Sequence, residues 1–285
     1  MTRLLRTAIL LTTAAAAQAQ AAGGPPIAYV KFEGSGASIY LANDGGSAPV
    51  KLYTTGSKRT IGHVDLRPGG GEIAFTEFGS GSPRIVKILS FDDAGRPLGS
   101  ARELGGVCGV DTVDYHPDGT KLIISEICAG AFQIAAIGTD GTGHVPLITS
   151  NNYLNKARWL KDGVSYVYAR SGRNGGPMEL CRNACEANDL LWTGSQLMWM
   201  DVGRQSNLIL FDSGGIYTHR LDADTATLQT NFLTGTDGHF SPGDADVLYE
   251  TPHEARGDYL MIRRSTGATV RLTAKGEYGS RDWRN

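Results

Sequence analysis

Six positions recur along this sequence at a regular interval, each directly before a large apolar residue, and five of them carry a charged or ionisable side chain. The intervals run from 40 to 49 residues, and the positions are Asp65, Asp114, Arg158, Met198, His239 and Asp282. If the fold gathers these positions, three carboxylates, an arginine and a histidine surround one polar site. Such a site suits a cation such as calcium, a basic peptide tail or a small polar ligand.

The same residues also suit a structural role. The aspartates would anchor turns through hydrogen bonds, or pair with the arginine along a solvated wall. We therefore expect a candidate ligand-binding ring at Asp65, Asp114, Arg158, His239 and Asp282, with the structural role as the alternative. We expect no resident cofactor, apart from a cation such as calcium bound within this ring.

Sequence signatures of covalent or metal-dependent catalysis are missing. There is no Gly-x-Ser-x-Gly nucleophile elbow, and residues 79–82 have the composition of a glycine–serine turn. No pair of histidines has the His-Glu-x-x-His spacing of a zinc site. The histidines are His63, His116, His144, His219, His239 and His253. We therefore assign no catalytic residue and no metal-ligand set.

The four cysteines are expected to form two disulfides. Cys108 and Cys128 each lie ten residues from Asp118, which occupies the tip of a predicted hairpin, so the two cysteines face each other across it. Cys181 and Cys185 would then close a small loop within residues 171–188. A metal or redox site there is the weaker alternative, since no partner histidine or cysteine lies nearby.

The elements that must position these residues are repeated β-hairpins. Asp-Leu-Arg-Pro-Gly-Gly at residues 65–70 precedes the β-rich segment 73–76, and Asp-Tyr-His-Pro-Asp-Gly at residues 114–119 precedes segment 122–125. Proline, aspartate and glycine favour a tight turn, while β-branched and aromatic residues favour the flanking strands. Further copies begin near Arg158, Met198 and His239. A repeat of this length is typical of a propeller blade.

The two ends of the chain complete each other. Residues 27–30 match the second strand of a blade without a first, and residues 281–285 match a first strand without a second. Pairing them would close a ring and protect two sheet edges. The sequence therefore predicts an all-β fold, a six-bladed β-propeller closed by pairing of its N- and C-terminal strands.

These turns, followed by an Ile-Ala-Phe-Thr strand at residues 73–76 and an Ile-Tyr strand at residues 39–40, resemble the WD-like repeats of TolB-type propellers. The resemblance covers nearly all of residues 22–285 and implies the fold more strongly than a function. TolB has an additional α/β domain ahead of its propeller, for which residues 22–285 leave no room, so the resemblance is to a propeller-only relative. Similar propellers also cap prolyl-oligopeptidase-type peptidases and form oligogalacturonate lyases.

The first residues have the pattern of a secretory signal. Arg3 and Arg6 precede an apolar run at residues 8–17, and Ala-Gln-Ala at residues 19–21 offers a cleavage site. We expect residues 1–21 to be removed, leaving a propeller domain at residues 22–285. Because the first cysteine is Cys108, no lipid-anchor site follows the apolar run. The expected location is therefore the periplasm or the cell exterior.

The overall charge and the architecture together favour protein binding. A formal charge of −2 lacks the basic excess of a nucleic-acid binder, and no later apolar stretch is long enough to span a membrane. We expect a monomeric, non-catalytic scaffold for another protein or a cell-envelope component, through loops at residues 78–83, 171–188 and 251–257. The alternative is an axial enzyme resembling a lyase or hydrolase, or a binder of a small polar ligand or cation.

Overall fold

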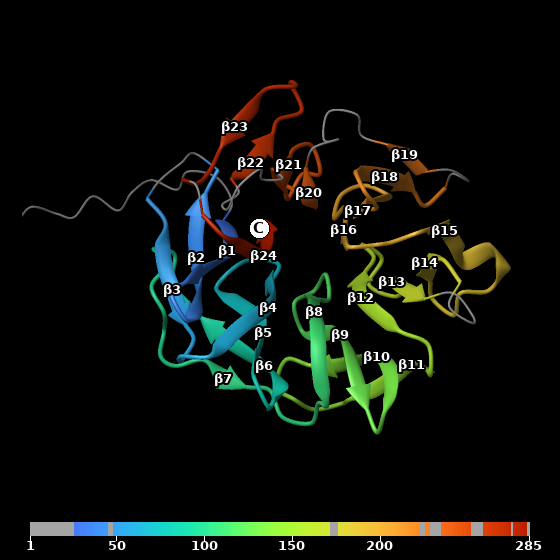
Figure 1. Cartoon of the computed structure of the whole chain (residues 1–285), viewed down its shortest axis with the longest axis horizontal. Helices are drawn as coiled ribbons and strands as arrows, with labels where there is room; N and C mark the ends of the chain where they lie inside the picture. Colours follow the sequence, from blue (N-terminus) through green and yellow to red (C-terminus); the bar gives the residue numbers. More distant parts are fainter. Residues whose placement is uncertain are drawn as a thin grey trace, which may run out of the picture.

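The computed structural model describes residues 26–44, 48–171, 176–222, 226–228, 235–251, 259–274 and 276–283. In these residues the chain forms six four-stranded antiparallel sheets, arranged as blades around a common axis (Figure 1). This confirms the predicted six-bladed β-propeller. The innermost strands are β4, β8, β12, β16, β20 and β24, which begin the blades at Arg59, Gly109, Leu154, Trp199, Thr236 and Tyr278.

Blade 1 comprises β4 (Arg59–Leu66), β5 (Glu72–Gly79), β6 (Ser82–Ser90) and β7 (Arg102–Glu103), and blade 2 comprises β8 (Gly109–Tyr115), β9 (Lys121–Cys128), β10 (Ala131–Gly138) and β11 (Val145–Ser150). Blade 3 comprises β12 (Leu154–Trp159), β13 (Tyr166–Ser171), β14 (Met178–Arg182) and β15 (Leu190–Gly194), with the short 3-10 helix η2 (Ala187–Asp189) before its last strand. Blade 4 comprises β16 (Trp199–Val202), β17 (Leu208–Asp212), β18 (Ile216–Arg220) and β19 (Ala226–Leu228). Blade 5 comprises β20 (Thr236–Phe240), β21 (Val247–Glu250), β22 (Leu260–Arg263) and β23 (Thr269–Arg271), and blade 6 comprises β24 (Tyr278–Trp283), β1 (Pro26–Glu33), β2 (Gly36–Asn43) and β3 (Val50–Thr54).

The turn between β8 and β9 shows how the sequence forms these hairpins. Asp118 Oδ1 accepts hydrogen bonds from the backbone N–H and the hydroxyl of Thr120, at 2.8 and 2.7 Å. Gly119 has a φ of +72°, which an L side chain rarely adopts. The turn brings Tyr115 opposite Leu122 and sets the register as far as Thr112, where a bulge before Val110 shifts the pairing by one residue.

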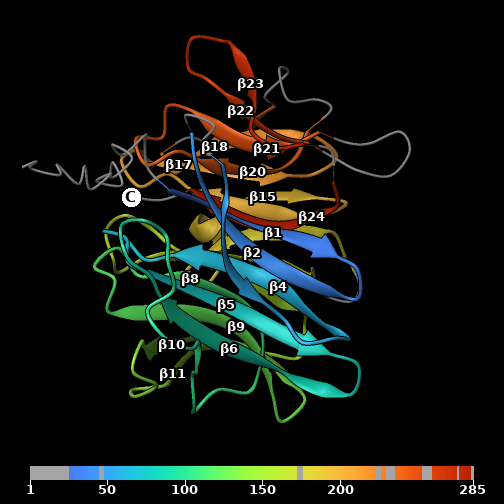
Figure 2. The ribbon, with the colours of Figure 1, turned by 90° about the vertical axis from the view of Figure 1, so that its left-hand side faces the viewer.

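Blade 6 is assembled from both ends of the described chain, as the sequence predicts. Strand β24 pairs antiparallel with β1, with Trp283 opposite Ile27 and Asp282 opposite Ala28. In the side view of Figure 2 the red β24 lies against the blue β1. This pairing gives β24 a neighbour that is more than two hundred residues away in the sequence, and it closes the ring.

The hydrophobic core lies between neighbouring blades. One cluster joins Val30 and Ile39 of blade 6 to Val64 and Phe75 of blade 1, and these four side chains are fully buried. A second cluster joins Trp283 to apolar residues of blade 5. Because each blade buries its faces against two neighbours, the loss of one strand affects three blades.

Both predicted disulfides are present. Cys108 pairs with Cys128, and Cys181 pairs with Cys185. We expected the second bridge to close a loop outside the blades, but it does not. Cys181 is buried in β14, so much of segment 171–188 belongs to blade 3.

Removal of the Cys108–Cys128 bridge is expected to destabilise the protein more than removal of the Cys181–Cys185 bridge. The bridges span 20 and 4 residues, so the chain-entropy model predicts losses of about 3 and about 2 kcal/mol. Urea unfolding of the two double Cys→Ser variants measures the difference. An equal loss in both variants would contradict this reasoning.

The expected contact loops differ from the structure in their form. Residues 78–83 are a tight hairpin, because β5 ends at Gly79 and β6 begins at Ser82. Residues 252–257 and the expected signal segment 1–21 lie outside the described residues. Within the described part of the chain, no helix has the length and apolarity needed to cross a membrane.

Candidate functional site

Six equivalent positions on the innermost strands face the propeller axis. The strand register identifies these positions. In every blade, the residue pairs with the equivalent residue of the second strand of that blade. All six residues are at most 3% exposed. They are Asp65, Asp114, Arg158, Asp201, His239 and Asp282.

The structure corrects one member of the predicted set. Met198 precedes β16 and is 56% exposed, whereas Asp201 stands opposite Leu210 just as Asp65 stands opposite Ala74. The repeat in this blade is degenerate. Trp199 resembles the large apolar residue of the motif, so the sequence pattern pointed to the residue before it, Met198. The large apolar residue of this blade is instead Val202, three positions later.

The four aspartates bond each blade to the next. Each uses one carboxylate oxygen to accept the backbone N–H of the residue after the equivalent position in the following blade. The bonds run from Leu66 to Asp282 at 2.8 Å, from Tyr115 to Asp65 at 2.6 Å, from Trp159 to Asp114 at 2.8 Å and from Phe240 to Asp201 at 2.8 Å. Buried hydrogen bonds are costly to lose, so these four bonds support the structural role of the aspartates.

Arg158 and His239 occupy the two positions that lack a carboxylate. The Arg158 guanidinium donates to the Ala157 carbonyl at 3.0 Å and contacts His63 Nε2 at 2.7 Å, and it lies 4.0 Å from Asp114. Arg204, from the turn after β16, reaches two blades away and donates to Asp114 Oδ1 at 2.9 Å. The Asp114 carboxylate therefore accepts a hydrogen bond from the next blade and also lies beside two arginines.

Trp199 lies among these charged groups. Its ring stacks on His63 at 5.0 Å and lies 5.6 Å from His239, and the Arg158 guanidinium is 5.8 Å from its centre. Its indole N–H donates to His239 Nε2 at 2.6 Å. The axis is thus occupied by stacked rings at this level.

The hydrogen bond from Trp199 fixes the state of His239. Burial lowers the pKa of this histidine well below its usual value, and the nearby Arg281 and Arg158 lower it further. The neutral ring accepts at Nε2, so its proton is at Nδ1. Nδ1 lies 4.0 Å from Asp201 and 3.9 Å from Asp282. His239 thus presents a donor to two carboxyl groups.

The pKa of Asp282 is shifted in the opposite direction to that of His239. Burial raises its pKa well above the usual range, and the neighbouring carboxylates Asp65 and Asp201 raise it further. Its side chain therefore holds a proton at pH values where an exposed aspartate is ionised. This reduces the negative charge at the axis.

A lysine joins the same region from blade 3. Lys156 has a φ of +59° and is half-buried, in the irregular start of β12. Burial, and then the charge of Arg158, lower its pKa from 10.5 to about 8, while Asp237 opposes the shift. Asp237 in β20 has the same left-handed backbone, with a φ of +51°.

The shifted lysine predicts a pH dependence of stability. In the unfolded chain Lys156 keeps its proton up to its ordinary pKa, so between about 8 and 10.5 the unfolded state binds more protons. The contribution of Lys156 to the free energy of unfolding should therefore rise with pH across this window. Urea unfolding of the wild type and Lys156→Met at several pH values isolates this contribution. Parallel pH profiles would contradict the shift.

An axial cavity of about 260 Å³ lies where the innermost strands end. Its floor includes the buried side chains of Asp201, Phe240 and Trp283, together with the half-buried Arg204. Its rim is formed by hairpin turns and includes the exposed Lys161 and Gln205, with Pro68, Pro117 and Pro242. This is the region in which the predicted ring meets the surface.

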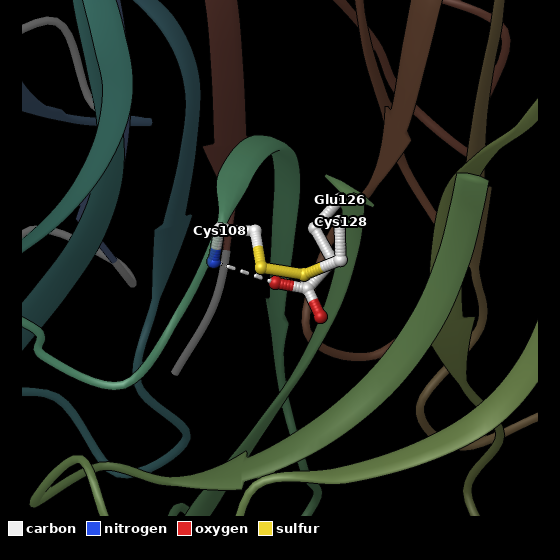
Figure 3. A group of neighbouring side chains, drawn as sticks. All are labelled: Cys108, Glu126 and Cys128. Atoms are coloured by element: carbon white, nitrogen blue, oxygen red, sulfur yellow. Dashed lines mark hydrogen bonds between the residues drawn. A yellow bond between two sulfur atoms is a disulfide. The ribbon is translucent and has the colours of Figure 1, made fainter. Parts of the chain in front are cut away.

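Metal-ligating side chains gather in three groups within the described residues. Two of these groups contain disulfide cysteines, whose sulfurs are bonded to each other. Figure 3 shows the first of them, Cys108, Glu126 and Cys128. The third is Asp201, His239 and Asp282. His239 fits poorly as a metal ligand, because its Nδ1 carries the proton and its Nε2 accepts from Trp199.

The remaining histidines are spread over the fold. His116 Nε2 bonds the Gly163 carbonyl at 2.7 Å, His144 lies 2.6 Å from Glu126, and His219 is buried in β18. Among the described histidines, His63 and His239 lie at the axis, and His253 lies outside the described residues.

Sequence reasoning missed His63, Trp199, Arg204 and Asp201 as axial residues. His63 and Trp199 lie two positions before the ring residues Asp65 and Asp201, and therefore on the same strand face. Inspection of the residue two positions before each ring residue would have identified both. Arg204 could not be found this way, since it reaches the axis from a turn.

Comparison with known proteins identifies the fold. No family model and no curated protein sequence matches the chain. A crystal structure of TolB from Acinetobacter baumannii is similar, with a TM-score of 0.74 and 16% identity over 91% of this chain and 66% of that chain. The chain thus spans about two thirds of that TolB.

Two other solved structures share the architecture. A structure from a nidogen–laminin complex has a TM-score of 0.68 and 7% identity over 91% of this chain and 98% of that chain. An oligogalacturonate lyase in complex with manganese has a TM-score of 0.53 and 12% identity over 79% of this chain and 73% of that chain. At these identities the similarity concerns the fold and not the activity. The chain has the six-bladed β-propeller fold seen in TolB.

Proposed function

We propose that this chain is an exported, non-catalytic scaffold that binds a segment of another protein or cell-envelope component at the axial cavity. The observation that carries this proposal is the cavity of about 260 Å³, whose buried apolar and charged floor is surrounded by turns on a rigid ring. The Lys161 ammonium stands at the rim and would meet an acceptor of the partner. Phe240 and Trp283 would contact an apolar side chain.

Several features support a binding role over a catalytic one. Four axial carboxylates accept backbone N–H groups at blade junctions, and His239 is buried with its Nε2 accepting from Trp199. A catalytic base needs access to the substrate proton that it removes. The similar nidogen–laminin structure is that of a complex between proteins, which is consistent with a scaffold.

Export is part of the proposal. The signal-like segment 1–21 and two disulfides both favour an oxidising compartment. The proposed location is the periplasm or the cell exterior, with residues 22–285 as a propeller domain that acts as a monomer. Nucleic acid is not a proposed partner.

Charge reversal at the rim tests the binding surface. Lys161→Glu is expected to abolish capture of the partner from the exported fraction of the native cells, because it would repel the acceptor that Lys161 meets. Lys161 is exposed, so the fold should not change. Capture with tagged wild-type and variant proteins, followed by mass spectrometry of the bound material, gives the measurement.

Lys58→Glu provides the matched control. Lys58 is also exposed but lies before β4, at the opposite end of the innermost strands. The Lys58→Glu variant should capture the same partner as the wild type. Identical capture by all three proteins would exclude the axial cavity as the binding surface.

A hard cation within the ring is the second candidate. The carboxyl groups of Asp201 and Asp282 and the imidazole of His239 lie together, with ligand atoms within 4.8 Å of one another. Calcium prefers oxygen ligands, so it would use the two carboxyl groups rather than the histidine, and it would displace the proton of Asp282. Calorimetric titration of calcium into the wild type and Asp201→Asn tests this, and equal heats would exclude the site.

A further inference from the structure

A second cavity, of about 230 Å³, lies away from the axis between blades 2 and 3. It is lined by the start of β8, the end of β9 and the start of β12, together with Arg84 of β6. These strand ends are opposite to the turn that carries Pro117, so the second cavity faces the other side of the propeller.

One wall of this second cavity is a preorganised polar network. Arg84 forms an ion pair with Asp111, and its guanidinium lies 4.7 Å from the Phe78 ring. The side-chain amide of Asn155 donates to Asp111 Oδ2 and to the Tyr153 hydroxyl oxygen. Asn155 is 2% exposed, so its contacts hold Asp111 and Tyr153 in place from beneath.

A buried carboxylate forms the opposite wall. Glu126 is 1% exposed, accepts the Cys108 backbone N–H at 2.9 Å and lies 2.6 Å from His144 Nε2. Figure 3 shows this carboxylate beside the Cys108–Cys128 disulfide, which ties the two strand ends together. The Glu126 side chain is 0% exposed, so it holds the Cys108 backbone and His144 in place and does not itself reach a ligand.

The remaining lining is apolar and partly open to solvent. Ile127 is 49% exposed and pairs across the hairpin with Phe132. The Phe132 ring meets the Tyr153 ring edge to face at 5.3 Å. Apolar rings beside fixed polar groups are the usual composition of a ligand site.

We propose that this second cavity binds one sugar ring of a neutral saccharide. The Asp111 carboxylate and the Tyr153 oxygen would accept hydrogen bonds from sugar hydroxyls, while Arg84 would donate to hydroxyl oxygens. Phe132, Tyr153 and Ile127 would contact the C–H face of the ring. The volume is below the roughly 300 Å³ at which pockets for drug-sized ligands begin, which favours a single ring over a larger ligand.

The charges of the second cavity favour a neutral ligand. The Arg84 cation is paired with the Asp111 carboxylate, and the Glu126 side chain is fully buried, so the accessible charges of the cavity balance each other. A purely apolar ligand would exclude water from Asp111 and Arg84 without replacing its hydrogen bonds, which is costly. A polyhydroxylated ring satisfies both requirements.

Titration with neutral tetrasaccharides tests this inference. Cellotetraose, maltotetraose and chitotetraose are titrated by calorimetry at millimolar concentrations into the wild type and two single variants, Asp111→Asn and Arg84→Gln. At least one tetrasaccharide should bind the wild type. Each variant should bind it about tenfold or more weakly, because each loses a charge-assisted hydrogen bond.

A matched control separates this site from general surface effects. Asp222→Asn removes one partner of the exposed ion pair between Arg220 and Asp222, and it should bind the tetrasaccharide like the wild type. Thermal unfolding checks that each variant is folded, and Arg84→Gln, whose side chain is 43% exposed, alters the core least. Lys161→Glu should leave saccharide binding unchanged, so failure here is distinct from failure of the axial proposal.

Three results would overturn the proposal. They are the absence of binding by all three tetrasaccharides, undiminished binding by Arg84→Gln and Asp111→Asn, and displacement of a bound tetrasaccharide by a tetralysine peptide. The last result would assign the second cavity to a basic side chain instead.

Discussion

Deletion of residues 278–285, which removes β24, is expected to abolish cooperative folding. The deletion takes Trp283 out of its cluster with blade 5 and removes the partner of β1. It also removes Asp282, which accepts the Leu66 N–H of blade 1. Loss of one buried tryptophan side chain alone costs about 3 to 5 kcal/mol, close to the whole stability of many domains. Circular dichroism and thermal unfolding of the truncated protein measure the result.

Moving the same strand to the other end of the chain should restore the fold. In this permuted variant residues 278–283 precede Pro26 through a short hairpin turn, which is compatible with the antiparallel pairing of β24 and β1. The permuted variant should unfold cooperatively near the wild-type midpoint. A truncated protein with a native spectrum and midpoint would show that ring closure is unimportant.

Asp114→Ala is expected to destabilise the propeller by about 3 to 5 kcal/mol, because it leaves buried charge uncompensated. Asp114 is fully buried, accepts the Trp159 N–H at 2.8 Å and pairs with Arg204 at 2.9 Å. The variant leaves the guanidinium of Arg204, and that of Arg158 at 4.0 Å, without this counter-charge. Urea unfolding measures the loss.

Asp114→Asn separates the two roles of this carboxylate. Asparagine can still accept the Trp159 N–H but lacks the charge that pairs with Arg204, so its loss of stability should be smaller than that of Asp114→Ala. Asp222→Ala, which breaks an exposed ion pair with Arg220, should leave the unfolding midpoint unchanged. Equal midpoints for Asp114→Ala and Asp222→Ala would contradict the assigned role of Asp114.

The structural role of the aspartates changes how tests of binding must be designed. Asp65 and Asp114 each accept a backbone N–H from the next blade, so alanine variants of either weaken the scaffold as well as any site. The Lys161 side chain at the rim of the axial cavity makes an exposed hydrogen bond to the Gln205 carbonyl, at 3.4 Å, rather than a buried one. For this reason scaffold binding is tested at the rim, and the cation site is tested with Asp201→Asn rather than with an alanine variant.

The fold was largely predictable because it depends on local chemistry that repeats. Turn residues such as Asp118 and Gly119 set each hairpin, and the alternation of β-branched residues sets each strand. The unmatched strand at each end also predicted the pairing of residues 27–30 with residues 281–285, in which Ile27 lies opposite Trp283. The first disulfide was predicted from the equal distance of Cys108 and Cys128 from the Asp118 turn, and the second from the closeness of Cys181 and Cys185 in the sequence.

The sequence by itself therefore determined the propeller, its closure, its disulfides and five of the six axial residues. Only the tertiary structure decided that Asp201 replaces Met198, that Trp199 stacks on His63 and bonds His239, and that Arg204 crosses to Asp114. It also revealed the second cavity around Asp111 and Glu126. The physical reason is that hairpin formation depends on neighbours in the sequence, whereas the axis and the blade junctions depend on contacts between side chains 40 or more residues apart.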